Sequence, residues 1–219
     1  ADLNLIKLFF NSILLFFLSS IFLISLSFIS NYGNRVTRSK LLNMLTLFSV
    51  SGYAIPGIIL AVAFITFISW FDNNIISFFG INSIKSIFIG SVLGLILIYF
   101  IRFYSLANNG IKSGYLKINY SIDESAYLLG YSKLKTFTNI HIPYLKNSMF
   151  LIGILISIEV IKELPITLIM RPFNFETFAT TAYIFASQDL LEAAAAPSLF
   201  LIIIASFFIL ITSRYILRD

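Results

Sequence analysis

Three charged side chains lie close together in an otherwise apolar stretch of the chain: Glu159, Lys162 and Glu163. On a helix, Glu159 and Glu163 share one face because they are four residues apart, and Lys162 can pair with Glu159. Inside a membrane each charge costs about 2.5 to 3.5 kcal/mol and usually faces a bundle interior or an aqueous path. Two interpretations are open: a cation-attracting lining or gate near the outer end of a path, or a structural ion pair.

Other residue types that carry chemistry are absent or isolated. The sequence has no cysteine, which excludes disulfides, thiolate metal sites and cysteine nucleophiles. The single histidine, His141, has no cluster of further ligands near it in the sequence, so we do not expect it to bind a metal. No nucleophile with its base occurs, and no glycine-rich phosphate loop. We therefore expect no catalytic site, no metal and no cofactor in this chain.

The composition sets the environment in which these residues lie. Apolar residues make up 58% of the 219 residues, charged residues 11%, and the mean hydropathy is +0.93. Soluble domains carry about 25% charged residues, so this chain cannot cover itself with a water-facing surface. We predict an all-α integral membrane protein with a single domain over residues 1–219. The net charge of +5 is explained by basic loops, and no nucleic-acid partner is expected.

Charge-free runs indicate where the chain crosses the membrane, since a crossing helix needs about 20 apolar residues. Five spans are predicted: between Lys7 and Arg35, between Lys40 and Asp72, over 86–101, over 147–170, and between Glu192 and Arg214. The third is short, but its flanking basic side chains can snorkel toward the headgroups.

Two of these spans are expected to be irregular. The second is too long for one straight crossing and contains Pro56 between Gly52 and Gly57, which predicts a break. Such a break either lines a cavity or is a packing kink. In the fourth span, Pro165 is expected to bend the chain toward the outer loop.

Basic residues gather on one side of the predicted spans, which the positive-inside rule makes the cytosolic side. They are Arg35, Arg38, Lys40, Arg102, Lys112, Lys117, Lys133, Lys135, Lys146, Arg214 and Arg218. The N-terminus is then outside and the C-terminus inside. Because the chain begins at Ala1 without Met, we expect that upstream residues are missing or removed.

A long inner loop over about residues 106–146 is too polar to cross the bilayer and too regular to be disordered. Ser121 and Glu124 have the spacing of a capping box, which predicts a helix start, and Gly130 can end that helix. A second short helix is expected over about 133–140, stopping near Pro143. Two short helices joined by a glycine predict a docking element.

The loop resembles that of the permease subunits of bacterial ATP-binding-cassette (ABC) importers. Their motif reads Glu-Ala-Ala, three residues, Gly, nine residues, Ile, one residue, Leu-Pro. The matching residues are Glu124, Ser125, Ala126, Gly130, Ile140, Ile142 and Pro143, with Ser125 in place of Ala and Ile142 in place of Leu. The resemblance implies a type I importer permease fold of about five transmembrane helices, with these residues in coupling helices that dock on a separate ATPase.

Further stretches are similar to the ferric-iron branch of these permeases. They are Tyr53–Gly57, Tyr99–Phe103, Glu159–Pro165 and Arg171–Thr177. That branch commonly has two fused halves of six spans each, and this chain resembles the second half without its first span. Thiamine, sulfate and polyamine permeases share the inner loop, so the substrate depends on the stretch from Glu159 to Thr177.

The resemblance implies a set of partners and a location. The partners are ATPase subunits that bind ATP and magnesium, a second permease half or copy, and an extracytoplasmic substrate-binding protein. The location is the bacterial inner membrane, with a multi-pass chain. The expected residues of the translocation path or gate are Pro56, Glu159, Lys162, Glu163 and Pro165.

The alternative from another class is an ion-driven secondary transporter or channel that uses Glu159 and Glu163 as a relay. Such a carrier has no need of a cytosolic loop with this spacing around Gly130, so the loop favours the permease.

Overall fold

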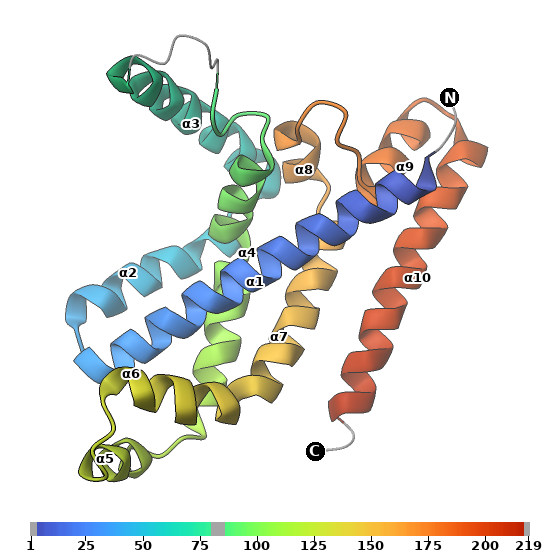
Figure 1. Ribbon diagram of the computed structural model, residues 1–219. Coiled ribbons are helices and arrows are strands. Elements are labelled where there is room, and N and C mark those ends of the chain that lie inside the picture. Colours follow the sequence, from blue (N-terminus) through green and yellow to red (C-terminus); the bar gives the residue numbers. More distant parts are fainter. Residues whose placement is uncertain (1–3, 80–85, 217–219) are drawn as a thin grey trace.

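The computed structural model describes residues 4–79 and 86–216, and nearly all of them lie in helices (Figure 1). No strand occurs within these two ranges. Five helical segments of the described chain are long and apolar enough to cross a membrane: Leu5–Thr37, Gly57–Phe78, Val92–Leu116, Lys133–Lys162 and Leu191–Tyr215. The predicted all-α membrane fold with five spans is therefore confirmed.

The core forms where three long helices cross. α1 (Leu5–Thr37) packs along α4 (Val92–Leu116) and α7 (Ile142–Lys162), and α4 also packs on α7. Leu23 and Ile98 are fully buried between them. Because each of these three helices packs on the other two, they form the frame on which the irregular segments are held.

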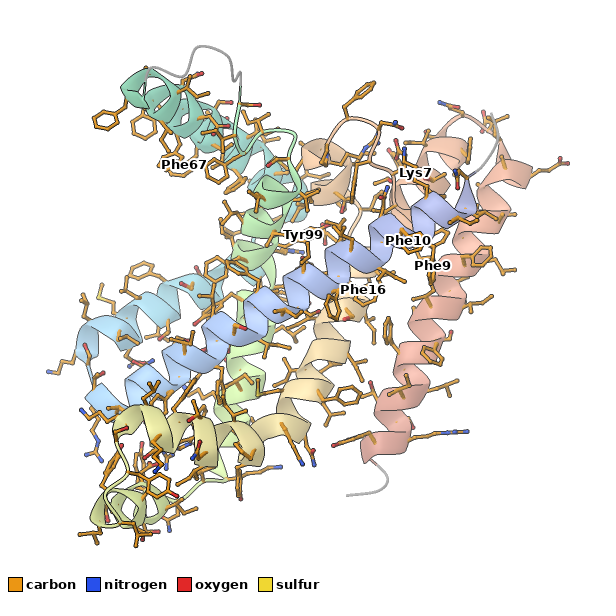
Figure 2. The ribbon with its side chains drawn as sticks, viewed as in Figure 1. Lys7, Phe9, Phe10, Phe16, Phe67 and Tyr99 are labelled. Carbon is orange, nitrogen blue, oxygen red and sulfur yellow. The ribbon has the colours of Figure 1, made fainter. Side chains whose placement is uncertain are left out.

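The remaining long helices surround this frame and face outward. α2 (Lys40–Val50) returns beside α1, α3 (Gly57–Phe79) leads away from the bundle, and α10 (Leu191–Ile216) packs on α9 (Phe178–Ser187) (Figure 1). Figure 2 shows aromatic side chains on outward-facing sides of the helices, including Phe10 of α1 and Phe67 of α3, which are 64% and 56% exposed. Apolar side chains in contact with solvent are expected only where the solvent is lipid or a partner covers them.

The two ends of the bundle differ. The N-terminal end of α1 lies beside α9, whereas the C-terminal end of α10 points toward the end that carries α5 (Tyr120–Leu128) and α6 (Lys133–Thr136) (Figure 1). The first turn of α1 and the last turn of α10 are thus at opposite ends, as the predicted topology requires. Which end faces the cytosol stays a prediction.

Both predicted breaks are present. α2 ends at Val50, a 3₁₀ turn η1 follows over Ser51–Ala54, and α3 starts at Gly57. α7 ends at Lys162, and a separate short helix α8 covers Pro165–Met170. We had expected the fourth span to continue to residue 170, but its helix ends at Lys162.

The third span differs from the prediction. It was expected over 86–101, but α4 begins at Val92 and continues to Leu116. The residues before it form a turn because Asp72, in the C-terminal half of α3, accepts hydrogen bonds from the backbone N–H groups of residues 87–89. Arg102 therefore lies in the middle of the helix, and only the residues after Leu116 leave it. Lys85, which flanks the predicted third span, and Arg218, one of the basic residues of the topology prediction, lie outside the described residues.

The helix near Pro143 also differs, because it does not stop there. α6, a π-helical turn η2 (Phe137–His141) and α7 form one continuous helical run from Lys133 to Lys162. Proline lacks an N–H group and its ring clashes with the carbonyl four residues earlier. The wider π turn directly before Pro143 accommodates both effects, so the helix passes through.

Candidate functional site

The two breaks face each other and form one site, which we call the paired break: Ser51–Gly57 together with Glu163 and Leu164. α3 packs on α8. A Cβ at Gly57 would lie 3.1 Å from Oε1 of Glu163 and 3.5 Å from the side chain of Pro165. Only a glycine allows this approach without movement of its neighbours. Two helix interruptions more than 100 residues apart in sequence therefore meet at Gly57.

Arg102 of α4 holds one side of the paired break. Its Nη1 donates a hydrogen bond to the carbonyl of Tyr53 at 2.9 Å and a second to the carbonyl of Ile55. These carbonyls are free because the helix is interrupted at Pro56. An unpaired carbonyl in lipid costs several kcal/mol, so these two hydrogen bonds stabilise the interruption. From the sequence we had expected Arg102 to snorkel toward the headgroups, and that expectation is wrong.

The turn is held close to α4 by a second glycine. A Cβ at Gly52 would overlap the backbone carbonyl of Ile101, so no larger residue fits between η1 and α4. Pro56 itself is exposed at the outer side of the turn. Pro56 therefore interrupts the helix, while the contacts that fix the interruption come from Gly52, Gly57 and Arg102.

The other side of the paired break is fixed by side chains of α4 and α8. Glu163 Oε1 accepts the backbone N–H of Ile166 at 3.4 Å, and the hydroxyl of Thr167 donates to the Glu163 carbonyl at 2.6 Å. Thr167 also bonds the hydroxyl of Tyr99, a fully buried residue that Figure 2 places near the centre of the bundle. Arg102 and Tyr99 are three residues apart, so one face of α4 holds both interruptions.

The three charges singled out in the sequence separate into a pair and a lone carboxylate. Lys162 Nζ lies 2.7 Å from Oε1 of Glu159, and the Lys162 side chain is 52% exposed. Glu163 follows the last residue of α7 and has an extended backbone. The prediction that it shares a helix face with Glu159 is therefore wrong. The prolyl ring at 165 prevents a regular continuation of the helix. Glu163 belongs to the paired break, whereas Glu159 and Lys162 lie on α7 before it.

At the opposite end of the bundle, α5 and α6 form the element predicted to dock. α5 begins at Tyr120, and its N-cap is Asn119, whose side chain accepts the N–H of Ser121 at 3.3 Å. The capping box of Ser121 and Glu124 is therefore wrong: Ser121 lies inside the helix and Glu124 points to solvent. Asn119 is the N-cap because its extended backbone places the side-chain oxygen within hydrogen-bonding distance of a free N–H group of the first turn.

Gly130 ends α5 with the backbone geometry that the sequence predicted. Its φ is +80°, its N–H bonds the carbonyl of Tyr127 at 3.0 Å, and the N–H of Tyr131 bonds the carbonyl of Ala126 at 3.0 Å. These two bonds define a Schellman motif, which favours glycine at this position. Apart from the glycine and its two chain neighbours, no atom of the described chain lies within 4 Å of a Cβ built at Gly130, so this turn is open to an incoming partner.

The motif residues of the loop are only partly brought together. Ser125, Ala126 and Ile140 line one cavity of about 340 Å³ between α5 and the helix that follows it. Glu124 lies on another side, in a cavity that also contains Arg38. Ile142 and Pro143 are exposed on the first turn of α7 and line neither cavity.

Sequence reasoning missed a buried polar cluster that ties α5 to the bundle. Oδ2 of Asp123 accepts a hydrogen bond from Nε of Arg35 at 2.6 Å, and Oδ1 accepts one from Nε2 of His141 at 2.7 Å. The imidazole lies between the rings of Tyr32 and Tyr115, with centroids 5.1 and 5.4 Å away. Since Arg35 and Asp123 are 88 residues apart, no local pattern in the sequence pairs them.

The described residues contain no group of three or more side chains of the kinds that hold a metal ion. His141 is accordingly a member of the Asp123 cluster, and its Nδ1 is buried without a partner.

Comparisons with solved structures identify the fold. The chain superposes on a bacterial ABC transporter involved in the import of the acidic polysaccharide alginate, with a TM-score of 0.72 and 17% sequence identity over 98% of this chain and 80% of that one. A second structure, the alginate ABC transporter in complex with a pentasaccharide-bound periplasmic protein, gives a TM-score of 0.74 and 17% identity over 97% and 78% of the two chains. No family model and no curated protein matches the sequence. The chain thus has the fold of an ABC importer permease, and at this level of identity the likeness concerns the fold alone.

Proposed function

We propose that this protein is the permease subunit of an ATP-driven importer, in which a separate ATPase binds ATP and magnesium and docks on the α5–α6 element. The observation that carries the proposal is the ABC permease fold along 98% of the chain, combined with a helical element at one end of its spans. Further support comes from exposed leucines on that element, Leu128, Leu129 and Leu134 at 89%, 78% and 73%. Apolar side chains outside the spans are typical of a surface that a partner covers.

The arrangement also provides a physical route between docking and transport. The Asp123 cluster fixes α5 to α1 through Arg35 and to the start of α7 through His141. α7 has 21 residues, about 30 Å at 1.5 Å per residue, and ends next to Glu163 at the paired break. A displacement of α5 by the ATPase would be carried along this rigid helix to the interruption that it borders.

For the substrate we propose ferric iron, which a binding protein outside the membrane delivers. The proposal rests on the resemblance of the stretch from Glu159 to Thr177 to ferric-iron permeases, and the lone Glu163 carboxylate at the paired break suits a cationic cargo. One of the structural neighbours was solved with a periplasmic protein bound, which supports a partner of that kind. Permeases for thiamine, sulfate or polyamines are the alternative within the class. A second permease half or copy would complete the pore.

We further propose the inner membrane as the location, with the α5–α6 element in the cytosol. The basic residues near this element, among them Arg38, Lys133 and Lys135, support that orientation.

Gly130→Glu tests the function. The glutamate has to adopt φ of about +80°, which costs a non-glycine residue roughly 1 to 2 kcal/mol, and it places a charge where the partner would pack. We expect the ATPase to be lost from the purified complex and uptake of ferric iron to be abolished, with membrane insertion unchanged. Gly130→Ala should be milder.

Gly90→Glu is the matched control. Gly90 also has a positive φ, +65°, and an open Cβ position, but it precedes the opposite end of α4. This variant should keep the ATPase. If Gly130→Glu retains full docking and uptake, the permease assignment fails and the ion-driven transporter is the next candidate.

A further inference from the structure

His141 is the single histidine of the chain, and histidine is the side chain whose ordinary pKa lies closest to neutral pH. The His141 side chain is fully buried, and its Nε2 donates to Oδ1 of Asp123 at 2.7 Å. The other oxygen of the same carboxylate accepts from Nε of Arg35 at 2.6 Å. One carboxylate of α5 therefore holds a permanent cation of α1 and a titratable imidazole at the start of α7.

The surroundings of the imidazole suit its neutral form. Uncharged rings lie beside it, Tyr32 of α1 and Tyr115 of α4. In the neutral form Nε2 carries the proton that is donated to Asp123, and Nδ1 is an acceptor. A second proton would make Nδ1 a donor, yet Nδ1 is buried and has no hydrogen-bond partner in the described chain.

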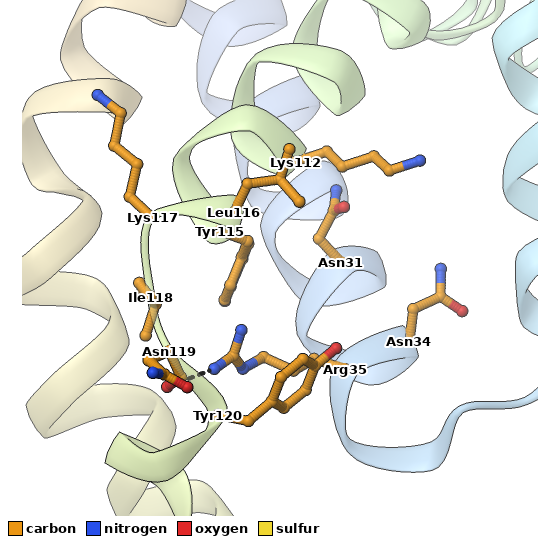
Figure 3. A pocket seen from close by; sticks show the side chains of 10 residues that line it. All are labelled: Asn31, Asn34, Arg35, Lys112, Tyr115, Leu116, Lys117, Ile118, Asn119 and Tyr120. Atoms are coloured by element: carbon orange, nitrogen blue, oxygen red, sulfur yellow. Dashed lines mark hydrogen bonds between the residues drawn. The ribbon is translucent and has the colours of Figure 1, made fainter.

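Arg35 is fixed on the other side of the carboxylate. Its Nη2 donates to the carbonyl of Asn119 at 3.0 Å, the bond drawn as a dashed line in Figure 3, and its guanidinium lies 4.2 Å from the ring centroid of Tyr120. The Arg35 side chain is also buried. Protonation of His141 would thus place a second positive charge beside a carboxylate whose charge the guanidinium already balances.

The charges next to this cluster do not compensate such a proton. A cavity of about 270 Å³ is lined by Asp123 and Arg35 and also by Arg38, Lys133 and Glu124. Three cationic side chains and two carboxylates therefore lie there before the imidazole is counted. Charging a buried imidazole in these surroundings costs free energy that charging it in water does not.

We propose that His141 makes the attachment of α5 to the bundle sensitive to protons. While α5 is attached, the imidazole is neutral and Asp123 joins it to Arg35. When α5 detaches, Nε2 loses its partner and meets water, where a histidine takes up a proton at about pH 6.5. The attachment is therefore strongest above about pH 6.5 and weakens as the pH falls below that value, because the detached state binds one proton more.

This inference concerns the contact between α5 and the bundle, so it holds with or without a docked ATPase. Its consequence for transport rests on the proposed function: acidification on the side of α5 would loosen the element on which the ATPase docks. The experiment below measures the attachment alone, and its failure would leave the proposed function standing.

The experiment compares rates of tryptic cleavage at Lys133 or Lys135 between about pH 7.5 and 5.5, on the complete chain in detergent. Each rate is divided by that of Asp123→Asn at the same pH, so that the pH dependence of trypsin itself cancels. The test variant is His141→Gln, whose amide can donate to Asp123 but takes up no proton in this range. The control is Glu124→Gln, because Glu124 is exposed and forms no ion pair within the described residues.

We expect the relative cleavage rate of the unchanged protein to rise on the order of tenfold as the pH falls through this range, since cleavage follows the detached population and detachment takes up one proton. Glu124→Gln should rise equally, and His141→Gln should stay constant. A constant ratio for the unchanged protein would overturn the proposal, and so would an equal rise in His141→Gln.

A second measurement depends on no variant, so it decides the matter even if His141→Gln detaches α5 at every pH. Because the chain has a single histidine, isotopic labelling of histidine nitrogens gives nuclear magnetic resonance signals of His141 alone. At about pH 7 we expect a neutral ring with its proton on Nε2. A positively charged ring at that pH, in protein that trypsin cleaves slowly, would show that the attached state accepts the proton and would refute the proposal.

Discussion

Gly57 is the residue at which the two halves of the paired break come closest. Its hypothetical Cβ lies 3.1 Å from a carboxylate oxygen of Glu163, inside the distance of ordinary van der Waals contact. A side chain at this position therefore has to move Glu163 or separate α3 from α8. Overpacking of this kind costs about 1 to 3 kcal/mol.

We accordingly predict that Gly57→Ala lowers substrate uptake while membrane insertion and ATPase retention stay normal. Gly33→Ala is the control, because a Cβ at Gly33 meets only Leu42 side-chain atoms at 3.8 and 3.9 Å. Uptake is measured per inserted permease. Normal uptake by Gly57→Ala would show that the two breaks need not stay this close during transport.

Removing the charge of Glu163 should reduce substrate uptake more than removing the charge of Glu159. Glu159 is neutralised by Lys162, whereas the structure gives Glu163 no ion pair among the described residues. Glu163→Gln keeps the side-chain shape and the acceptor for Ile166 but removes the charge that would attract a cation. We predict a several-fold loss of uptake for Glu163→Gln, a smaller loss for Glu159→Gln, and ATPase association unchanged in both and in the double variant. Equal or absent effects of the two single changes would make both residues structural.

Asp123 is the residue on which the attachment of α5 depends. Asp123→Asn removes the negative charge between Arg35 and His141 and leaves the guanidinium, 7% exposed, without its counter-ion. Breaking a buried pair in this way costs about 3 to 5 kcal/mol. We predict that α5 detaches and that trypsin cleaves at Lys133 or Lys135 at least several times faster.

The control for this change is the neighbouring exposed residue. Glu124→Gln removes one charge from the same helix, but Glu124 is exposed and forms no ion pair within the described residues, so the cleavage rate of this variant should equal that of the unchanged protein. A rate for Asp123→Asn that is no higher would mean that packing alone holds α5.

At the scale of the elements, α4 connects the parts of the site. Arg102 and Tyr99 fix the two breaks, while Tyr104 bonds Ser30 of α1 at 2.6 Å and Asn108 bonds Asn31 at 2.8 Å. These bonds continue along the helix toward the end that carries α5. A shift of α4 relative to α1 therefore has to disturb these polar contacts, and a shift of α4 relative to η1 or α8 has to disturb the paired break.

Much of the element order follows from the sequence, because lipid requires long uncharged helices and because proline interrupts them. The run from Lys40 to Asp72 exceeded one crossing and contained Pro56, so its break could be predicted, and Pro165 predicted the second. The role of Gly130 in ending α5 could be predicted from local turn geometry alone. Each of these inferences depends on neighbours in the sequence.

Two of the errors have a different cause, which is contact between segments far apart in the sequence. α4 passes through Arg102 because its guanidinium reaches carbonyls 49 and 47 residues earlier, a contact that no local pattern contains. The Asp123 cluster likewise joins distant segments. The error at the start of α5 is instead local, because Asn119 and Ser121 are both good capping residues and backbone geometry makes Asn119 the N-cap.

At the scale of the whole molecule, the distribution of charge and apolar surface defines its position in the membrane. The sides of α3 and α10 expose large apolar residues, and the basic residues near α5 and α6 lie at one end. Asn74 and Asn174 belong to the segments at the opposite end, and both are exposed, as is Ser132 between α5 and α6. These three positions can report the orientation without disturbing the core.

We predict that single cysteines at Asn74 and Asn174 react with an impermeant thiol reagent in intact cells, and that one at Ser132 reacts only after the cells are opened. The chain has no cysteine of its own, so each signal comes from the introduced residue. Labelling in opened cells is the control for accessibility. Reaction at Ser132 alone in intact cells would place the basic end outside, and an ATPase in the cytosol could then not reach the α5–α6 element.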